Sequence, residues 1–236
     1  MSNIKHLQYG TTTIEYDLLL EERKTLGIKV YPDRRVTVTA PLDSSHTNIE
    51  EHLKKKAHWI VKQQKYFLNF EPRTPARKYI SGETHLYLGR QYRLKVLESS
   101  EEGVKLMGGN LEVRTNVKND TNQVERLLKK WYQAKADIHF HRIFKENMPL
   151  ANELTEKPLA LKHSWMKKRW GSCTVKGTII LNTELIKAPT ACIEYVMIHE
   201  VCHLKHLNHS AAFFTLLAAK LPNYEAVKDR LERVMV

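Results

Sequence analysis

The spacing of apolar residues predicts a β-rich first half that contains one helix. Short β-branched segments alternate with polar residues, which is typical of half-buried strands. From Thr47 to about Asn69 the period becomes helical, and Thr47-Asn-Ile-Glu50 has the form of a capping box. The predicted strands are Thr11–Leu20, Gly27–Tyr31, Arg35–Ala40, a hairpin over Tyr79–Val96 that turns near Gly89-Arg90, and Leu111–Thr115.

The second half changes to longer helical patterns around a small sheet. A helix is expected from Asp120 to Asn147, where Pro149 would stop it. The strands Leu159–Met166, Arg169–Thr174 and Thr178–Asn182 follow, and then the helices Thr190–Leu207, Ser210–Lys220 and Asn223–Val234. No repeat or low-complexity block is visible. We therefore expect an α+β fold, with an N-terminal β-rich region over residues 1–118 and a second domain over 119–236.

Composition narrows the class of protein. The chain has 236 residues, 42% of them hydrophobic and 27% charged, which is typical of a globular protein. No apolar run approaches the roughly 18 residues that span a bilayer, and the N-terminus lacks the pattern of a signal peptide. Three cysteines at unpaired spacings argue against a disulfide framework. We expect a cytoplasmic protein without membrane contact, and the sequence predicts no oligomeric state.

The chain is strongly basic, with a net charge of +12. The excess is even, with 20 basic and 14 acidic residues up to Lys118, and 18 and 12 after it. Such a surface attracts polyanions, so non-specific contact with nucleic acid is one candidate interaction. The simpler interpretation is that the lysines and arginines solvate exposed faces, because no nucleic-acid-binding motif accompanies them.

Candidate chemistry is concentrated in residues 199–209, HEVCHLKHLNH. His199 and His203 are four residues apart, so on a helix both imidazoles project from one face and can bind one metal ion. Glu200 lies about 100° further round the helix, where it can serve as general base toward water on the metal. Zinc suits imidazole ligands. We expect one Zn²⁺ per chain, which other divalent ions such as Ni²⁺ could replace in vitro.

The third ligand is predicted to be His209. His206 lies on nearly the same helix face as His199, but about 10.5 Å along the axis, which makes joint ligation awkward. A glutamate from a later helix, Glu225 or Glu232, stays open as the weaker alternative.

This assignment depends on where the helix ends. Asn208 suits the left-handed conformation that terminates a helix, and Ser210 suits the N-cap of the next one. If the chain turns at Leu207-Asn208, His209 swings back to the metal.

Residues near the motif receive structural interpretations. Cys202 is expected to be a small buried residue, and no separate histidine arrangement supports Cys173 as a nucleophile. Trp170-Gly171-Ser172 is expected to border the cleft, where glycine allows close backbone approach, and packing of Trp170 in the core is the equal alternative. His139 and His141, on the long helix, are interpreted as surface or core residues rather than ligands.

Residues 169–214 resemble the YgjP-like metallopeptidase family, predicted metal-dependent hydrolases of prokaryotes. The matching pieces are Trp170-Gly-Ser-Cys173, Leu181-Asn182, Ala188-Pro189, His199-Glu with His203, Asn208-His-Ser210 and, upstream, Ser81-Gly-Glu83, Leu88-Gly89 and Tyr92-Arg-Leu94. The resemblance implies a zincin-like core related to SprT-like and WLM-type peptidases, with a backing helix, a small sheet, the HExxH helix and C-terminal helices. It also implies His209 as third ligand.

Motif and resemblance together predict a zinc-dependent hydrolase that cleaves peptide bonds in a peptide or protein substrate, with Glu200 moving the proton. Zincins lay substrate along a sheet edge, for which the hairpin 169–182 is the candidate. Arg169, His206 and Tyr224 are unassigned candidates for stabilising the oxyanion. The alternative is a DNA-associated protein whose metal hydrolase acts on nucleic-acid-bound protein or on a non-peptide bond.

Overall fold

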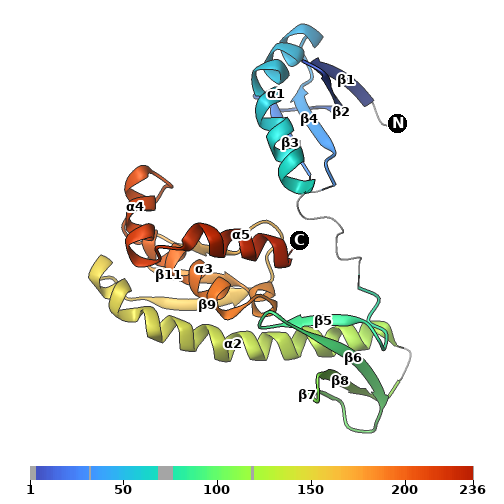
Figure 1. Cartoon of the computed structure of the whole chain (residues 1–236), viewed down its shortest axis with the longest axis vertical. Coiled ribbons are helices and arrows are strands. Elements are labelled where there is room, and N and C mark those ends of the chain that lie inside the picture. The colour runs from blue at the N-terminus through green and yellow to red at the C-terminus, as the bar shows by residue number, and fades with distance from the viewer. Residues whose placement is uncertain (1–3, 32, 69–76, 118–119, 236) are drawn as a thin grey trace. The chain divides into compact units, whose positions relative to one another are not determined.

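The computed structural model describes residues 4–31, 33–68, 77–117 and 120–235. Contacts divide the chain into two compact units, with the boundary in the sequence between residues 74 and 75. The described residues form three small sheets and five α-helices, so the fold is of the mixed α+β class, as predicted (Figure 1). Among these residues, no helix is long and apolar enough to cross a membrane.

The first unit is a four-stranded sheet with a helix packed on one face. Its elements are β1 (Ile4–Tyr9), β2 (Thr12–Glu21), β3 (Gly27–Val30), β4 (Val36–Pro41) and α1 (His46–Leu68), with strand order β1-β2-β4-β3. Alternate residues of β2 and β4 are buried together with one stripe of α1, as expected for a half-covered sheet. These side chains form a hydrophobic core that belongs to this unit alone.

Two predictions for the first unit need correction. The pattern misses β1, because Leu7 is its one buried residue and gives no alternation. Ser45 rather than Thr47 caps α1, since the Ser45 hydroxyl accepts the N–H of Asn48 at 3.3 Å. The predicted helix end at Asn69 lies outside the described residues.

The second unit begins with another four-stranded sheet. Its elements are β5 (Thr84–Tyr87), β6 (Arg90–Glu98), β7 (Gly103–Met107) and β8 (Asn110–Thr115), in the order β5-β6-β8-β7, followed by α2 (Thr121–Leu154). The predicted hairpin is confirmed, with its turn at Leu88-Gly89. Sequence reasoning misses β7, an edge strand without a fully buried residue.

The two four-stranded sheets are one arrangement that occurs twice. We call residues 4–68 the first repeat and residues 84–154 the second repeat. In each, an antiparallel hairpin is joined by a parallel pair to a second antiparallel pair. The register is the same in all three strand pairs of the two repeats. In the hairpin, Leu7 pairs with Ile14, and His85 pairs with Tyr92 at the corresponding place. The parallel pair matches Leu18–Val38 with Val96–Val113, and the last antiparallel pair matches Gly27–Thr39 with Gly103–Arg114.

The helices that close the repeats begin in the same way. Ser45 accepts the N–H of the residue three positions on, and so does Asp120. With these caps superposed, buried Leu53 corresponds to buried Leu128. The structure therefore contains a repeat that is not visible in the sequence. Sequence comparison within the chain fails because backbone pairing is kept while buried side chains differ, as at Leu7 and His85.

The long helix α2 continues through Pro149, where a break is predicted. Proline has no N–H to donate to the carbonyl four residues earlier, so one helical bond is lost. The residues beyond it are well packed: Ala151 is buried, and Leu150 and Leu154 contact the core. Burial of this last stretch compensates for the lost hydrogen bond, so tertiary packing overrides the local signal.

The rest of the second unit consists of a small sheet and three helices, of which α3 packs against α2 and α4 and α5 pack against α3. The elements are β9 (Ala160–Ser164), β10 (Gly171–Cys173), β11 (Thr178–Asn182), the 3₁₀ helix η1 (Thr183–Lys187), α3 (Thr190–Cys202), α4 (Ala211–Lys220) and α5 (Tyr224–Met235). The strand order is β10-β11-β9, which leaves β10 at an edge. Helix α3 contacts both α2 and α5 and is largely buried (Figure 1).

Helix α3 ends at Cys202, not at the predicted Leu207. His203 follows as its C-cap in the right-handed conformation, and the next residues form tight turns that bond to the carbonyls of Val201 and Cys202. Asn208 does not take the left-handed conformation expected of it. The turn is favoured because the His203 ring bonds to the carbonyl of His206, which a continuous helix would not present to it.

The predicted boundary after residue 118 falls inside the second unit. Leu94 and Val113 of the second repeat belong to the same hydrophobic cluster as Leu128 of α2 and Ile193 of α3. A shared core holds these elements together, so the chain divides after residue 74 rather than after 118.

Candidate metal centre

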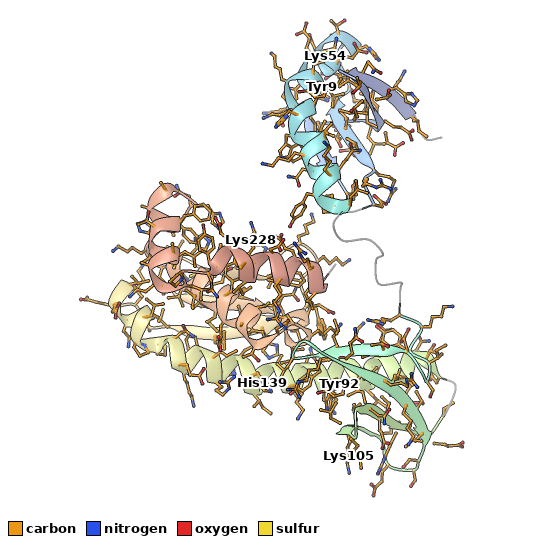
Figure 2. The ribbon with its side chains drawn as sticks, in the orientation of Figure 1. Tyr9, Lys54, Tyr92, Lys105, His139 and Lys228 are labelled. Atoms are coloured by element: carbon orange, nitrogen blue, oxygen red, sulfur yellow. The ribbon has the colours of Figure 1, made fainter. Side chains whose placement is uncertain are left out.

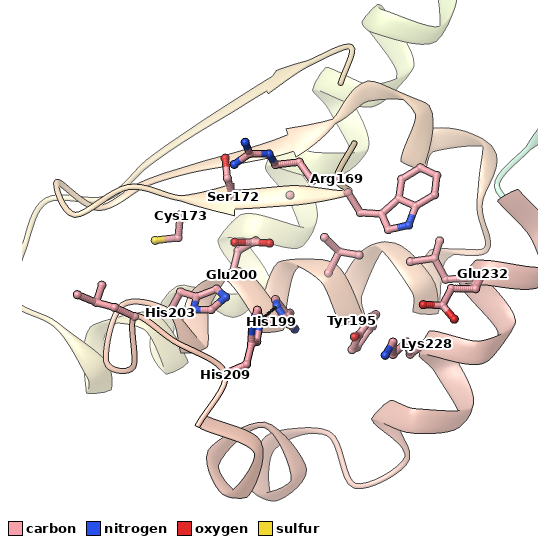
Figure 3. Close-up of a pocket in the computed structure, with 15 residues that line it drawn as sticks. Arg169, Ser172, Cys173, Tyr195, His199, Glu200, His203, His209, Lys228 and Glu232 are labelled. Carbon is pink, nitrogen blue, oxygen red and sulfur yellow. Dashed lines mark hydrogen bonds between the residues drawn. The ribbon is translucent and has the colours of Figure 1, made fainter. Parts of the chain in front are cut away.

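A cleft in the second unit brings the sequence motif together. Strand β10 forms one wall, and α3 and α5 form the opposite side, around a cavity of about 410 Å³ (Figure 3). His199, His203, Glu200 and His209 all line it. The motif therefore faces a concave site large enough for part of a ligand.

Three imidazoles converge at one end of this cleft. His199, His203 and His209 each offer a ring nitrogen, and these nitrogens lie within 4.8 Å of one another. The Nε2 atoms of His199 and His209 are 2.9 Å apart (Figure 3). His203 stays one turn after His199 although α3 has ended, because its C-cap backbone is still helical.

The tautomer of His203 is set by the turn after α3. Its Nδ1 lies 2.9 Å from the carbonyl oxygen of His206, an acceptor, so Nδ1 carries the proton and Nε2 keeps its lone pair. Metal-bound histidines are commonly oriented by such a bond at the second nitrogen. His206 thus contributes its backbone carbonyl to the site.

Phe213 of α4 supports all three imidazoles, and sequence reasoning misses it. Its buried ring lies 4.9, 4.6 and 4.8 Å from the rings of His199, His203 and His209. Its position four residues after His209, one turn into the following helix, is the signal that could have revealed it.

Burial favours the neutral form of two imidazoles of the cluster, His199 and His209. Burial lowers the pKa of His199 to about 4, with further lowering from His203, His209 and Lys228. Burial also lowers the pKa of His209. Metal ligation requires unprotonated imidazole. Three converging imidazole nitrogens fit a divalent cation of the type that prefers this donor.

Glu200 points away from the imidazoles toward the backbone of β10 (Figure 3). It is 5% exposed, and burial raises its pKa to about 7, against the opposing charge of Arg169. A carboxyl group with this pKa can accept and release a proton near neutral pH. A Cβ on Gly171 would lie 2.6 Å from the Glu200 Oε1 atom, so the strand glycine makes room for the carboxylate.

With this geometry in view, the chain can be compared with known proteins. The family model of the YgjP-like metallopeptidase domain matches residues 24–234. The chain belongs to the YgjP-like metallopeptidase family. The resemblance in the sequence motifs is thereby confirmed, and the match also includes most of the first unit.

Solved structures and curated proteins add to this comparison. The zymogen of abylysin, a metallopeptidase of Pyrococcus abyssi, is 23% identical with a TM-score of 0.36, and the match covers 41% of this chain and 99% of that one. The zymogen of the metallopeptidase jannalysin of Methanocaldococcus jannaschii is 21% identical with a TM-score of 0.34, covering 39% and 91%. No curated protein matches the chain.

The other candidate ligands lie elsewhere. Glu232 lines the cleft on α5, and the cluster of converging donors in the described residues holds neither Glu232 nor Glu225. Arg169 lines the cleft close enough to Glu200 to affect its pKa. Tyr224 instead donates a hydrogen bond to Glu225. For this YgjP-like chain, the structure therefore groups His209 rather than a glutamate with the HExxH histidines.

The cysteines and the remaining histidines follow their structural interpretations. Cys202 is fully buried. Cys173 borders the cleft, and burial together with Glu200 raises the pKa of its thiol to about 11, so it is protonated at neutral pH and a poor nucleophile. His139 bonds to the Tyr87 hydroxyl, and the ring of His141 bonds to the carbonyl oxygen of Asp137.

Proposed function

We propose that this YgjP-like protein is a zinc-dependent metallopeptidase with a zincin-like core. The observation that carries the proposal is the convergence of three imidazoles beside a buried carboxyl group with a pKa near neutrality. Membership of a metallopeptidase family supports a peptide or protein substrate and a divalent metal. The chemistry of three imidazole donors favours zinc within that class.

In this proposal His199, His203 and His209 hold one zinc ion per chain. The His203 ring is fixed by the His206 carbonyl, and Phe213 packs against all three rings. Orienting the donors before the ion binds reduces the entropy lost on binding. When bound, zinc supplies Lewis-acid polarisation of a carbonyl group and of water.

Glu200 is the proposed general base and acid. Its carboxylate takes a proton from the attacking water, and the same group returns that proton to the leaving amine, so no net proton is consumed. Burial keeps the carboxyl pKa near 7, which makes both transfers accessible at neutral pH.

The edge of β10 is the proposed docking line for the substrate backbone. β10 pairs only with β11 within its sheet, and Gly171, Ser172 and Cys173 line the cleft. An extended peptide can add to such an edge through main-chain hydrogen bonds, which agrees with the assignment of the hairpin 169–182.

The role of Glu200 is tested by Glu200→Gln. We expect the variant to keep its metal and its melting temperature but to lose peptide hydrolysis, because the amide cannot accept the proton. Metal content and cleavage of a mixed peptide library are measured side by side. Loss of the metal in this variant would make Glu200 a ligand, and retained hydrolysis would remove it as the base.

The ligand set is tested by comparing His209→Ala with His206→Ala. Only the first removes a converging nitrogen, since His206 serves the site through its backbone. A competitive zinc titration should therefore find a large affinity loss for His209→Ala. His206→Ala should lose no more than about the 10–100-fold typical of supporting contacts. The reverse order, or no loss in either variant, would overturn the ligand assignment.

A further inference from the structure

A second cavity of the second unit lies on α2, outside the catalytic cleft. It has a volume of about 540 Å³ and is formed by one face of α2 and by Trp165, in the loop between β9 and β10. Asn122, Arg126, Lys130 and Gln133 contribute to the helical wall. Their spacing of three to four residues places them on one side of the helix. We call this feature the α2 groove.

The α2 groove carries cations without ion-pair partners. Lys129 is held by Glu125 at 2.7 Å. Arg126 and Lys130 are exposed, and in the described parts of the chain neither forms an ion pair. Two positive charges on one wall thus remain available to an anionic ligand. The net charge of +12 would also attract such a ligand to the protein as a whole.

The aromatic wall of the groove is held in place. The loop from Trp165 to Trp170 is fixed by buried Asn182, whose side chain accepts the N–H of Met166 at 3.2 Å and donates to the carbonyls of Met166 and Arg169 at 2.8 and 3.0 Å. Trp165 is partly buried against the core. Lys187 Nζ lies 5.9 Å from the centroid of the Trp165 ring. The indole that lines the groove with the cations of α2 is therefore held in place, so little ordering is needed on binding.

The same loop connects the groove to the catalytic cleft. Trp165 lines the groove, while Arg169 and Trp170 line the cleft. Lys167 and Lys168, between them, are exposed. The sequence WMKKRW thus forms a basic and aromatic track between the two sites.

We propose that the α2 groove binds single-stranded nucleic acid. Phosphates are placed at Arg126 and Lys130, and an unpaired base stacks on Trp165. Proteins that bind single strands combine these two elements, a cationic path for the backbone and an aromatic ring for the bases. An acidic peptide would satisfy the cations but offers no base to the indole, and a duplex keeps its bases stacked internally.

The proposal does not depend on the metallopeptidase activity and is tested with chelator present. Binding of a fluorescent oligothymidylate to the full-length protein is measured over a series of salt concentrations. For Arg126→Gln/Lys130→Gln we expect the slope of log affinity against log salt to become shallower by about 1.4, since each lost contact with a single strand removes about 0.7.

A matched control comes from the first repeat. Lys54 and Lys55 are exposed on α1, where they correspond to Lys129 and Lys130. Lys54 is labelled in Figure 2. Lys54→Gln/Lys55→Gln removes the same net charge and should leave the slope unchanged. An equal decrease of the salt slope in both double variants would mean that the whole protein surface attracts the oligonucleotide, and it would reject the α2 groove as the binding site.

Trp165 is tested separately for stacking. Trp165→Leu should lower affinity about fivefold or more without changing the salt slope, whereas Trp165→Phe, which keeps a ring, should bind nearly as the parent does. Thermal melting of both variants confirms that they fold. Absence of binding at low salt would reject the proposal. Equal affinity for a duplex, or equal competition by polyglutamate, would reject it in favour of a simple anion surface.

Discussion

The two repeats share a strand order and a register but end differently. In the first repeat, α1 ends at Leu68, and its buried residues complete a hydrophobic core that contains only residues of this unit. In the second, α2 runs on to Leu154, and Phe140 and Ile143 join the core that holds α3. The same strand arrangement therefore serves once as a self-contained unit and once as the base of the proposed catalytic site. The difference lies in what packs beyond the sheet.

The corresponding hairpins illustrate this difference at single residues. Tyr9 of the first repeat is 39% exposed (Figure 2). Its counterpart Tyr87 is 9% exposed and packs on Trp131 with ring centroids 4.9 Å apart. The turn after Tyr87 donates two N–H groups to the carbonyls of Ile186 and Lys187 in η1. Elements that follow later in the chain thus pack against the hairpin turn of the second repeat, whereas Tyr9 at the corresponding place in the first repeat stays exposed.

The largest expected effect on stability comes from truncating one buried leucine in each of the two cores. Leu53→Ala and Leu128→Ala each truncate a fully buried leucine and should each cost about 2–5 kcal/mol. Because the cores are separate, only Leu128→Ala should weaken metal retention. Calorimetry of the full chain, with metal content measured in parallel, tests this. A single transition that shifts equally in both variants would contradict the independence of the units.

A smaller effect separates the two hairpin turns. Gly10 and Gly89 both have positive φ, which costs an alanine about 1–2 kcal/mol. A Cβ at Gly89 would also lie 2.7 Å from Pro189, whereas one at Gly10 meets nothing within 4 Å. Gly89→Ala should therefore cost about 1–3 kcal/mol more than Gly10→Ala. Chemical denaturation of both variants measures the difference, and equal losses would argue against the docked turn.

The smallest expected effect is a loss of stability at acidic pH. Burial is the main cause that lowers the pKa of His85, which bonds to Glu83 at 3.0 Å, while the first repeat has Leu7 at that position. A base with a lowered pKa stabilises the fold above its unfolded pKa of 6.5 and loses that contribution as the pH falls through 6.5 and below.

Stability of the second unit should accordingly drop from pH 7 to 5, and His85→Leu should remove part of that dependence, because His199, whose pKa is lowered to about 4, contributes to the rest. The first unit, without such a group at Leu7, serves as an internal reference. Thermal melts across this pH range measure both transitions. An unchanged slope in His85→Leu would mean that other groups dominate the acid response.

The fold was partly predictable because burial follows local periodicity. Strands with two or more alternating buried residues, such as β2 and β4, are found from the sequence. β1 and β7 are missed because they pack through one side chain or none. Pro149 leads to a wrong prediction of the end of α2, because the burial of Ala151 beyond it depends on elements that are distant in the sequence. The parallel pairings that reveal the repeat join strands that are not consecutive in the chain, so local periodicity does not disclose them.

The candidate site was predictable where spacing alone sets geometry. The four-residue interval between His199 and His203 specifies a shared face, and the three predicted imidazoles do converge. The proposed reason for His209 was inaccurate, since α3 ends at Cys202 and Asn208 is not left-handed. Phe213 and Lys228 could not be assigned because their approach depends on how α4 and α5 fold back.

The contact between Gly171 and Glu200 has a consequence for the variation that this protein can accept. At position 171 the space between strand and carboxylate is filled by a hydrogen atom, and even a methyl group would come within 2.6 Å of a carboxylate oxygen. Every one of the other residue types would displace that oxygen. If the carboxylate is the base, a single-nucleotide change in this glycine codon suffices to disable the enzyme while leaving its histidines intact.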